Sequence, residues 1–205
     1  LNTAMIIVLS PAKHLIMNLN QTMIYSLPCI FESILQNYIN NLKTKEPKDI
    51  ATLMGLSDKL ATLNFDRYQS WSPAKKVSAD SKPSMLVFKG DVYQGLQAED
   101  LSKSEMKFAQ KHIRILSGLY GLLRPLDLIQ PYRLEMGSNL KNDRGHNLYQ
   151  YWSNIVSNKL NLDLEKSKYN EIINLASVEY SKVINTKIIS ANIINPQFLE
   201  EKIIH

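Results

Sequence analysis

The chain has 205 residues, with 24 Lys and Arg against 19 Asp and Glu, and a net charge of +5. Apolar residues make up 44% and charged residues 21%, which is typical of a folded globular protein and excludes a disordered, collagenous or coiled-coil chain. The single cysteine, Cys29, excludes an internal disulfide and a cysteine-rich zinc site, and favours a reducing, cytoplasmic compartment. No apolar run is long enough to span a membrane, so no membrane partner is expected.

The excess of positive charge is concentrated in one part of the chain. Residues 101–150 carry eight basic and four acidic residues, which is four of the five net charges. A basic surface of this kind attracts polyanions, because many weak phosphate contacts add up and release counterions. The alternative is that the stretch is simply a solvated face, and charge alone favours this alternative.

The pattern of apolar residues predicts a mixed arrangement of helices and strands. In chain order we expect a strand at Met5–Leu9, a helix over Cys29–Lys43, two helices across Ile50–Leu63 broken at Gly55, and a strand at Met85–Phe88. A capping box of Ser102 and Glu105 then predicts the start of a long helix, whose buried residues extend as far as Leu119 or Tyr120. A helix at Leu148–Leu160 and strands at Ile172–Leu175 and Ile188–Ile194 complete the prediction. Strands and helices do not alternate as regular βαβ units. We therefore predict an α+β fold, in a single domain over residues 1–205.

Residues 48–64 have the pattern of a helix-hairpin-helix element. Gly55, Leu56 and Ser57 form a turn between two short apolar helices, and Lys59 follows at the start of the second. In such a motif the unpaired backbone amides of a helix N-terminus bind a DNA phosphate. Ser57 stands where the motif usually has a second glycine, and Asp58 repels phosphate. A simple corner with a glycine C-cap is the alternative.

A second stretch, Phe88–Gly95, follows the predicted strand at Met85–Phe88. Lys89 is suited to hold an anion there, Asp91 to orient it, and Tyr93 adds a hydroxyl. The alternative is a glycine-permitted turn with a surface ion pair.

A third stretch, residues 116–137, contains the rigid segments Arg124–Pro125 and Pro131–Arg133. Arginine suits bidentate recognition of phosphate or carboxylate. Internal pairs of Arg124 with Asp127 and of Arg133 with Glu135 would explain the same residues without a ligand.

No catalytic set and no metal site is recognisable. The four histidines, His14, His112, His146 and His205, are scattered without metal-ligand spacing. We expect His112 to be structural and Cys29 to be a buried small residue rather than a nucleophile. The sequence thus predicts no catalytic residue, no metal ligand and no cofactor.

Several of these segments occur in one order that resembles a known family. They are Ser10-Pro-Ala-Lys13, Leu56-Ser-Asp-Lys-Leu60, Phe88-Lys-Gly-Asp-Val-Tyr-Gln-Gly95, the run from Leu116 to Asp127, Pro131-Tyr-Arg-Leu-Glu-Met136 and Asn174-Leu-Ala-Ser177. Over almost the whole chain this series resembles the peroxide stress protein YaaA family, also called UPF0246 or DUF328.

The resemblance implies a cytoplasmic bacterial protein that limits damage by hydrogen peroxide and is linked to keeping free intracellular iron low. It also implies a family-specific mixed fold with a helix-hairpin-helix element, a positively charged cleft, and binding to plain or distorted double-stranded DNA. It implies no established reaction.

This sequence departs from the family at two points. Position 178 is Val, in Ser177-Val-Glu-Tyr180, where the family usually has Asn. Family members usually continue beyond the position of His205 with a basic segment, so we expect a chain shortened at its C-terminus, with less charge in the cleft and weaker DNA binding.

Two hypotheses of function follow. In the first, the protein binds DNA through Gly55, Leu56, Ser57 and Lys59, with Lys13, Lys89, Arg124 and Arg133 along the cleft. In the second, an enzyme or sensor binds a small anion such as a nucleotide in a pocket formed by Ser10, Lys13, Lys89, Asp91, Tyr93, Arg124, Arg133 and Glu135. Direct iron storage is a weaker third option, since no iron site is recognisable. The sequence leaves the oligomeric state open.

Overall fold

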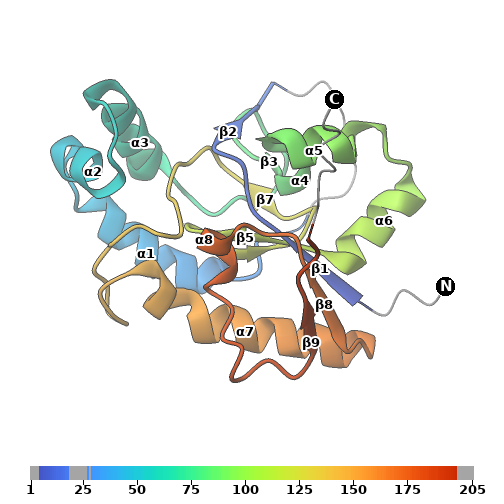
Figure 1. Cartoon of the computed structure of the whole chain (residues 1–205). Helices are drawn as coiled ribbons and strands as arrows, with labels where there is room; N and C mark the ends of the chain where they lie inside the picture. Colours follow the sequence, from blue (N-terminus) through green and yellow to red (C-terminus); the bar gives the residue numbers. More distant parts are fainter. Residues whose placement is uncertain (1–4, 19–26, 28, 198–205) are drawn as a thin grey trace, which may run out of the picture.

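A computed structural model describes residues 5–18, 27 and 29–197. Its main sheet contains β1 (Met5–Leu9), β5 (Ile113–Ser117), β6 (Gly121–Leu123), β8 (Glu171–Asn174) and β9 (Asn192–Ile194), in the order β6-β5-β1-β8-β9 (Figure 1). β1 pairs in parallel with both β5 and β8, β9 pairs in parallel with β8, and only β6 is antiparallel to its neighbour. The carboxyl ends of β5, β1, β8 and β9 therefore lie along one edge, which we call the carboxyl edge.

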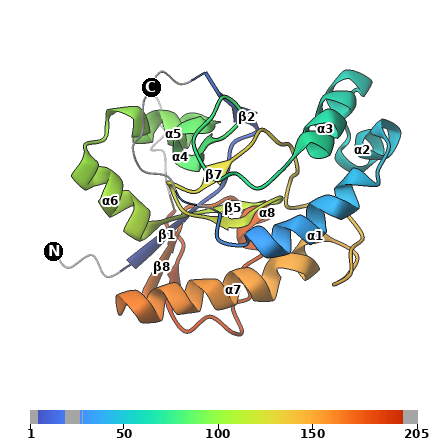
Figure 2. The same cartoon turned by 180° about the vertical axis from the view of Figure 1, so that it is seen from behind.

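The helices lie on both sides of this sheet. They are α1 (Glu32–Lys43), α2 (Pro47–Met54), α3 (Asp58–Ser70), α4 (Ser84–Val87), α5 (Asp91–Leu96), α6 (Lys103–His112), α7 (Leu148–Ser167) and α8 (Val178–Ser181), with a 3-10 turn at Ala98–Asp100. Two small ladders pair β2 (His14–Leu15) with β4 (Phe88–Lys89), and β3 (Lys82–Pro83) with β7 (Leu128–Ile129). α7 runs along one side of the sheet and α4, α5 and α6 lie on the other, while α2 and α3 project at one end (Figures 1 and 2).

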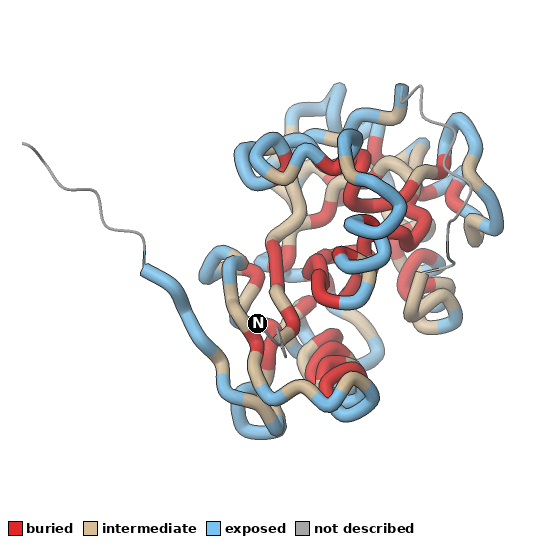
Figure 3. The backbone as a smooth tube through the Cα atoms, turned by 90° about the vertical axis from the view of Figure 1, so that its right-hand side faces the viewer, coloured by how far each residue is buried: buried red, intermediate tan, exposed pale blue. Residues whose placement is uncertain are grey.

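Aromatic side chains join α1 to α7. The ring centroids of Tyr38 and Tyr151 are 4.7 Å apart, and those of Phe31 and Trp152 are 5.8 Å apart. Trp152 is fully buried, and its indole N–H donates to the carbonyl of Gly118 at 2.9 Å. This contact ties α7 to the end of β5. Figure 3 shows the buried segments of the backbone and the exposed loops around them.

Several predicted elements are confirmed. The apolar run Met5–Leu9 is a strand, and the capping box of Ser102 and Glu105 starts α6. Two helices separated at Gly55 are present, and the helix that begins at Leu148 extends to Ser167. The part of the chain that the structure describes contains no helix long and apolar enough to cross a membrane.

Two predictions of secondary structure are wrong. The segment Met85–Phe88 is mainly the short helix α4, because the amides of Ser84 and Met85 donate to carbonyls of residues 127 and 125. The helix expected to extend to Leu119 or Tyr120 ends at His112, because Ile113–Ser117 pairs with β1 instead. The last predicted strand is also shorter, covering Asn192–Ile194 alone.

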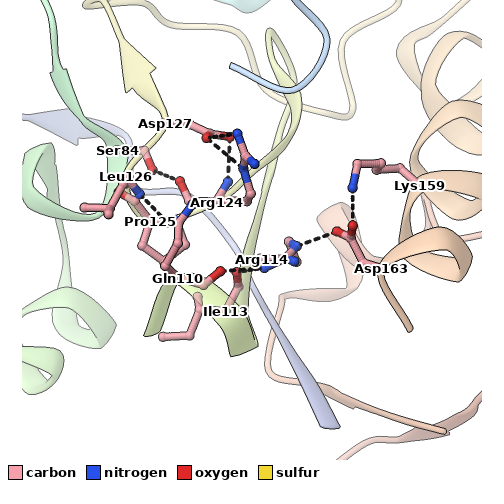
Figure 4. A network of polar contacts seen from close by, with 10 residues as sticks. All are labelled: Ser84, Gln110, Ile113, Arg114, Arg124, Pro125, Leu126, Asp127, Lys159 and Asp163. Atoms are coloured by element: carbon pink, nitrogen blue, oxygen red, sulfur yellow. Dashed lines mark hydrogen bonds and ion pairs between the residues drawn. The ribbon is translucent and has the colours of Figure 1, made fainter. Parts of the chain in front are cut away.

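A buried ion pair fixes α7 against β5 (Figure 4). The guanidinium Nε of Arg114 donates to Asp163 at 2.8 Å, and both side chains are at most 11% exposed. Lys159 also contacts Asp163, and Arg114 donates to the carbonyls of Gln110 and Ile113. Burial alone would raise the pKa of Asp163, but the charges of Arg114 and Lys159 and their hydrogen bonds bring it below its ordinary value.

The turn between β5 and β6 generates a first prediction. Gly121 has φ of +70°, and a Cβ there would lie 2.6 Å from the Trp152 ring. The substitution Gly121→Ala should lower the free energy of unfolding by about 3 kcal/mol, the sum of left-handed strain and overpacking. Urea unfolding measures this. The control Gly95→Ala lies in exposed helix with no atom within 4 Å, and should be neutral or slightly stabilising.

The Asp163 ion pair generates a second prediction. An acid whose pKa is lowered by folding contributes stability above its unfolded pKa, and that stability is lost as pH falls through the folded pKa. Asp163→Asn should therefore reduce stability at pH 7 and flatten its decline below about pH 5. Urea midpoints from pH 7 to pH 3 measure both effects. An equal change in the exposed control Asp66→Asn would contradict the assignment.

Candidate functional site

The carboxyl edge brings together residues from two strand ends that are far apart in the sequence. Ser10 follows β1 and Ser177 follows β8. The Ser177 amide donates to the Ser10 hydroxyl at 2.8 Å, and the two hydroxyls are 3.2 Å apart. The phenol of Tyr93, from α5, donates to the Ser10 carbonyl at 2.7 Å. Burial raises the pKa of Tyr93, so the phenol remains a hydrogen-bond donor.

A second group of contacts involves Lys13, which follows the end of β1 by four residues. Glu135 Oε1 accepts from Lys13 at 3.2 Å and from Arg133 at 3.3 Å. The phenol of Tyr68, near the end of α3, donates to the Arg133 carbonyl at 2.6 Å. We call Ser10, Lys13, Arg133, Glu135 and Ser177 the edge cluster. It contains four of the residues expected at a ligand pocket, and the predicted internal pair of Arg133 with Glu135 is present.

The segment after β8 holds the Arg133 loop in place. The Gly137 amide donates to the Glu179 carboxylate at 3.0 Å, and a Tyr180 hydrogen bond reaches the Met136 backbone. Val178, at the position where the family resemblance leads us to expect Asn, is 71% exposed. This departure therefore falls at a solvent-exposed position.

Lys89 and Asp91 lie next to the edge cluster without belonging to it. Lys89 pairs through its backbone with His14, the neighbour of Lys13. Its side chain is exposed and lines a separate cavity of about 240 Å³ with Tyr93 and Gln97. Asp91 is exposed at the first position of α5.

Arg124, also expected in the pocket, lies elsewhere. Leu123 pairs with Ile115, so Arg124 is level with the beginning of β5 and not with its carboxyl end. Its guanidinium binds the buried Asp127 at 2.8 and 2.9 Å, and its amide donates to the same carboxylate (Figure 4). The predicted internal pair of Arg124 with Asp127 is therefore present, and it joins the two ends of the turn at residues 124–127.

The α2–α3 pair has the backbone features expected of a hairpin turn. Gly55 has φ of +59° and ends α2, and the Leu56 amide donates to the Ala51 carbonyl. Ser57 precedes α3, but its side chain makes no capping hydrogen bond. Lys59 is exposed in the first turn of α3. Because the Ser57 side chain does not cap the helix, backbone amides in the first turn of α3 can donate to an external acceptor.

Acidic and basic groups are mixed around this turn. Between α2 and α3 lies a hollow of about 430 Å³ lined by Pro47, Lys48, Asp58 and Thr62. Asp58 is exposed beside Lys59, so the local surface is not uniformly positive.

A larger cavity, of about 480 Å³, lies along β9, from Asn192 at the beginning of that strand to Asn195 just after its end, and it reaches Asn174 at the end of β8. We call it the amide cavity, because its polar lining consists of Asn174, Asn192, Asn195, Ser181 and Thr186, with three apolar side chains. Asn174 donates to Asn195 at 2.7 Å and accepts from the Ala176 amide at 3.1 Å. The lining carries no charged side chain.

His112 is buried, and Cys29 is partly buried against the hydrophobic core. His112 Nδ1 contacts the Met5 carbonyl at 2.9 Å, and its ring stacks between Phe108 and Tyr169. Burial raises the pKa of the Cys29 thiol to about 12, so it is not a thiolate nucleophile at neutral pH. Within residues 5–18, 27 and 29–197, no three His, Cys, Asp or Glu side chains gather as metal ligands.

Sequence reasoning missed the contribution of the segment 174–180 to this edge. The signal was present, because Asn174-Leu-Ala-Ser177 follows a predicted strand. Only the parallel pairing of β8 with β1 shows that the strands preceding Ser177 and Ser10 end at the same edge of the sheet.

Comparison with known proteins identifies the family of the chain. The family profile described as "Peroxide stress protein YaaA" matches residues 5–204. A UPF0246 protein of Marinomonas sp. (strain MWYL1) is 50% identical over 195 residues, which cover 95% of this chain and 74% of that protein. The resemblance that the motifs indicate is thereby confirmed: the chain belongs to the YaaA family of peroxide stress proteins.

Proposed function

We propose that the protein binds double-stranded DNA, plain or distorted, through the α2–α3 turn. In this proposal it acts in the cytoplasm during peroxide stress and limits DNA and protein damage linked to free intracellular iron. The peroxide stress role follows from the family, and the family resemblance is the support for the cytoplasmic location and the link to iron.

One observation carries the DNA-binding proposal. Gly55 takes a left-handed backbone at the end of α2, and Ser57 leaves its capping position unused at the start of α3. Open amides at the N-terminus of a 13-residue helix, together with the helix dipole, favour a phosphate at that point. Such contacts are to the DNA backbone, so they position the protein without reading base sequence.

The charges near the turn set the expected strength of binding. Lys59 is placed to add attraction and Asp58 to reduce it, so one hairpin supplies a weak contact. Exposed lysines elsewhere, including Lys13 and Lys89 near the carboxyl edge, would add phosphate contacts. Arg124 is better explained by its pair with Asp127 than by a contact to DNA.

The experiment is fluorescence anisotropy of labelled plain and bulged duplexes across a salt series. Lys59→Glu should weaken binding about tenfold at low salt and reduce the salt slope by about one unit, because a phosphate contact is lost. The control Lys107→Glu makes the same charge change on exposed α6, away from the turn.

Equal losses in the two variants would show that net charge, rather than the hairpin, determines affinity. A second variant tests the turn itself. Gly55→Ala has no atom within 4 Å of its new Cβ, so it would act through backbone strain alone. It should weaken DNA binding while leaving most of the salt slope intact.

A further inference from the structure

The edge cluster is a separate feature from the proposed DNA-binding turn. Tyr68 contacts the Arg133 loop, and Lys59 lies at the other end of the same helix. A rise of 1.5 Å per residue separates the two positions by about 14 Å along α3. A ligand held by the edge cluster would therefore use residues that the α2–α3 turn does not supply.

The position of the cluster suits a small ligand. Ser10 and Ser177 end two adjacent parallel strands, and the crevice outside the carboxyl ends of such strands is where α/β sheets bind ligands. The hydroxyl of Ser10 accepts from the Ser177 amide, so its position is fixed by backbone as well as side-chain contacts.

The edge cluster has more N–H hydrogen-bond donors than the Glu135 carboxylate accepts from. In the part of the chain that the structure describes, Arg133 donates from its side chain only to Glu135, at 3.3 Å, and its Nε is buried with no hydrogen-bond partner. A guanidinium offers five N–H donors. Lys13 is 62% exposed, and exposed ion pairs are weak, so its ammonium can leave Glu135 for a stronger anion. Two cations and one carboxylate leave one positive charge for such an anion.

The loop that carries Arg133 is held before any ligand arrives. Tyr68 donates to the Arg133 carbonyl at 2.6 Å, and Glu179 accepts from the Gly137 amide at 3.0 Å. A site whose backbone is already fixed loses little conformational freedom on binding.

The amide cavity provides a second, uncharged compartment. Its lining includes Asn174, which ends β8 three residues before Ser177, and Ser181, which ends α8. Its volume of about 480 Å³ is in the range of small-molecule sites. An asparagine side chain has two N–H donors and one acceptor oxygen, the groups that pair with the edge of a nucleobase. Asn174 and Asn195 bond to each other, so each offers a nucleobase only its remaining capacity.

We propose that the carboxyl edge is a nucleotide-binding site, with phosphate at Lys13 and Arg133 beside the Ser10 and Ser177 hydroxyls, and with the base in the amide cavity. The charged cluster and the uncharged cavity match the two chemically distinct parts of a nucleotide. This site uses none of the residues of the α2–α3 turn, and it shares only Lys13 with the additional phosphate contacts proposed for DNA.

The test is calorimetric titration of the full chain with AMP, ATP, adenosine and inorganic phosphate, each without DNA. AMP and ATP should bind more tightly than adenosine or phosphate alone, since only they fill both compartments. Arg133→Gln should weaken AMP binding by about tenfold, and Lys13→Ala by a smaller factor. Lys107→Ala is the matched control on exposed α6 and should leave AMP affinity unchanged.

A variant in the amide cavity separates the two compartments. Asn192 is exposed on β9, so Asn192→Ala should leave folding intact and weaken AMP binding by about fivefold without changing phosphate binding. Equal affinity for AMP and phosphate would overturn the assignment of the base, and no heat with any nucleotide would overturn the site.

A competition experiment separates this proposal from the DNA proposal. At distinct sites, unlabelled duplex can change the affinity for AMP only up to a plateau, whereas competition for one site grows without limit as the duplex concentration rises. Displacement that persists in Lys59→Glu would show that the edge cluster is a DNA contact instead. Failure of AMP to bind would leave the anisotropy result on the α2–α3 turn unaffected.

Discussion

The parallel pairing of β1 with β5 on one side and β8 on the other is the constraint on which the site depends. It brings the ends of segments that are more than a hundred residues apart in the sequence to one edge. Ser10 and Ser177 meet because their strands end together, and the Asn174 side chain lies at the same edge for the same reason. The buried pair of Arg114 and Asp163 holds the helix α7 against this sheet.

Buried tyrosines then fix the loops that leave the sheet. Tyr93 donates to the Ser10 carbonyl and Tyr68 to the Arg133 carbonyl, while Tyr132 shares a hydrogen bond of 2.7 Å with Ser117. Burial raises the pKa of each of these phenols, so all three stay protonated at neutral pH. A phenol has one donor and a rigid ring, so it satisfies a loop carbonyl at small entropic cost.

The sequence predicted those elements whose signals are local. The run Met5–Leu9, the capping box at Ser102 and the left-handed glycine at Gly55 depend on near neighbours, and each is present in the structure. The short helix at Ser84–Val87 could not be predicted, because its amides bond to a loop some forty residues away. The end of α6 at His112 was missed for a similar reason, since an apolar run of residues 113–117 suits a helix or a strand until β1 pairs with it.

The candidate site, like the fold, could be predicted only in part from the sequence. Lys13, Arg133 and Glu135 were expected in one pocket and do contact one another, whereas Arg124 was grouped with them only because it has the same chemistry. Its antiparallel strand takes it away from the carboxyl edge, and a sequence pattern does not show strand direction. Residue type therefore indicated which side chains suit an anion, and topology decided which of them can share one.

The two proposed contacts are joined by a single rigid element. α3 begins at the turn proposed to bind DNA, and Tyr68 near its other end holds the backbone of Arg133. A displacement of this helix on DNA would act on the Arg133 carbonyl directly, and a ligand that reorders Arg133 would act on the helix in return. Coupling of this kind is reciprocal in binding free energy. Any change that duplex makes in the affinity for AMP should therefore equal the change that AMP makes in the affinity for duplex. That change should be smaller in Tyr68→Phe, which removes the hydroxyl that joins α3 to Arg133 and leaves the ring in its buried position.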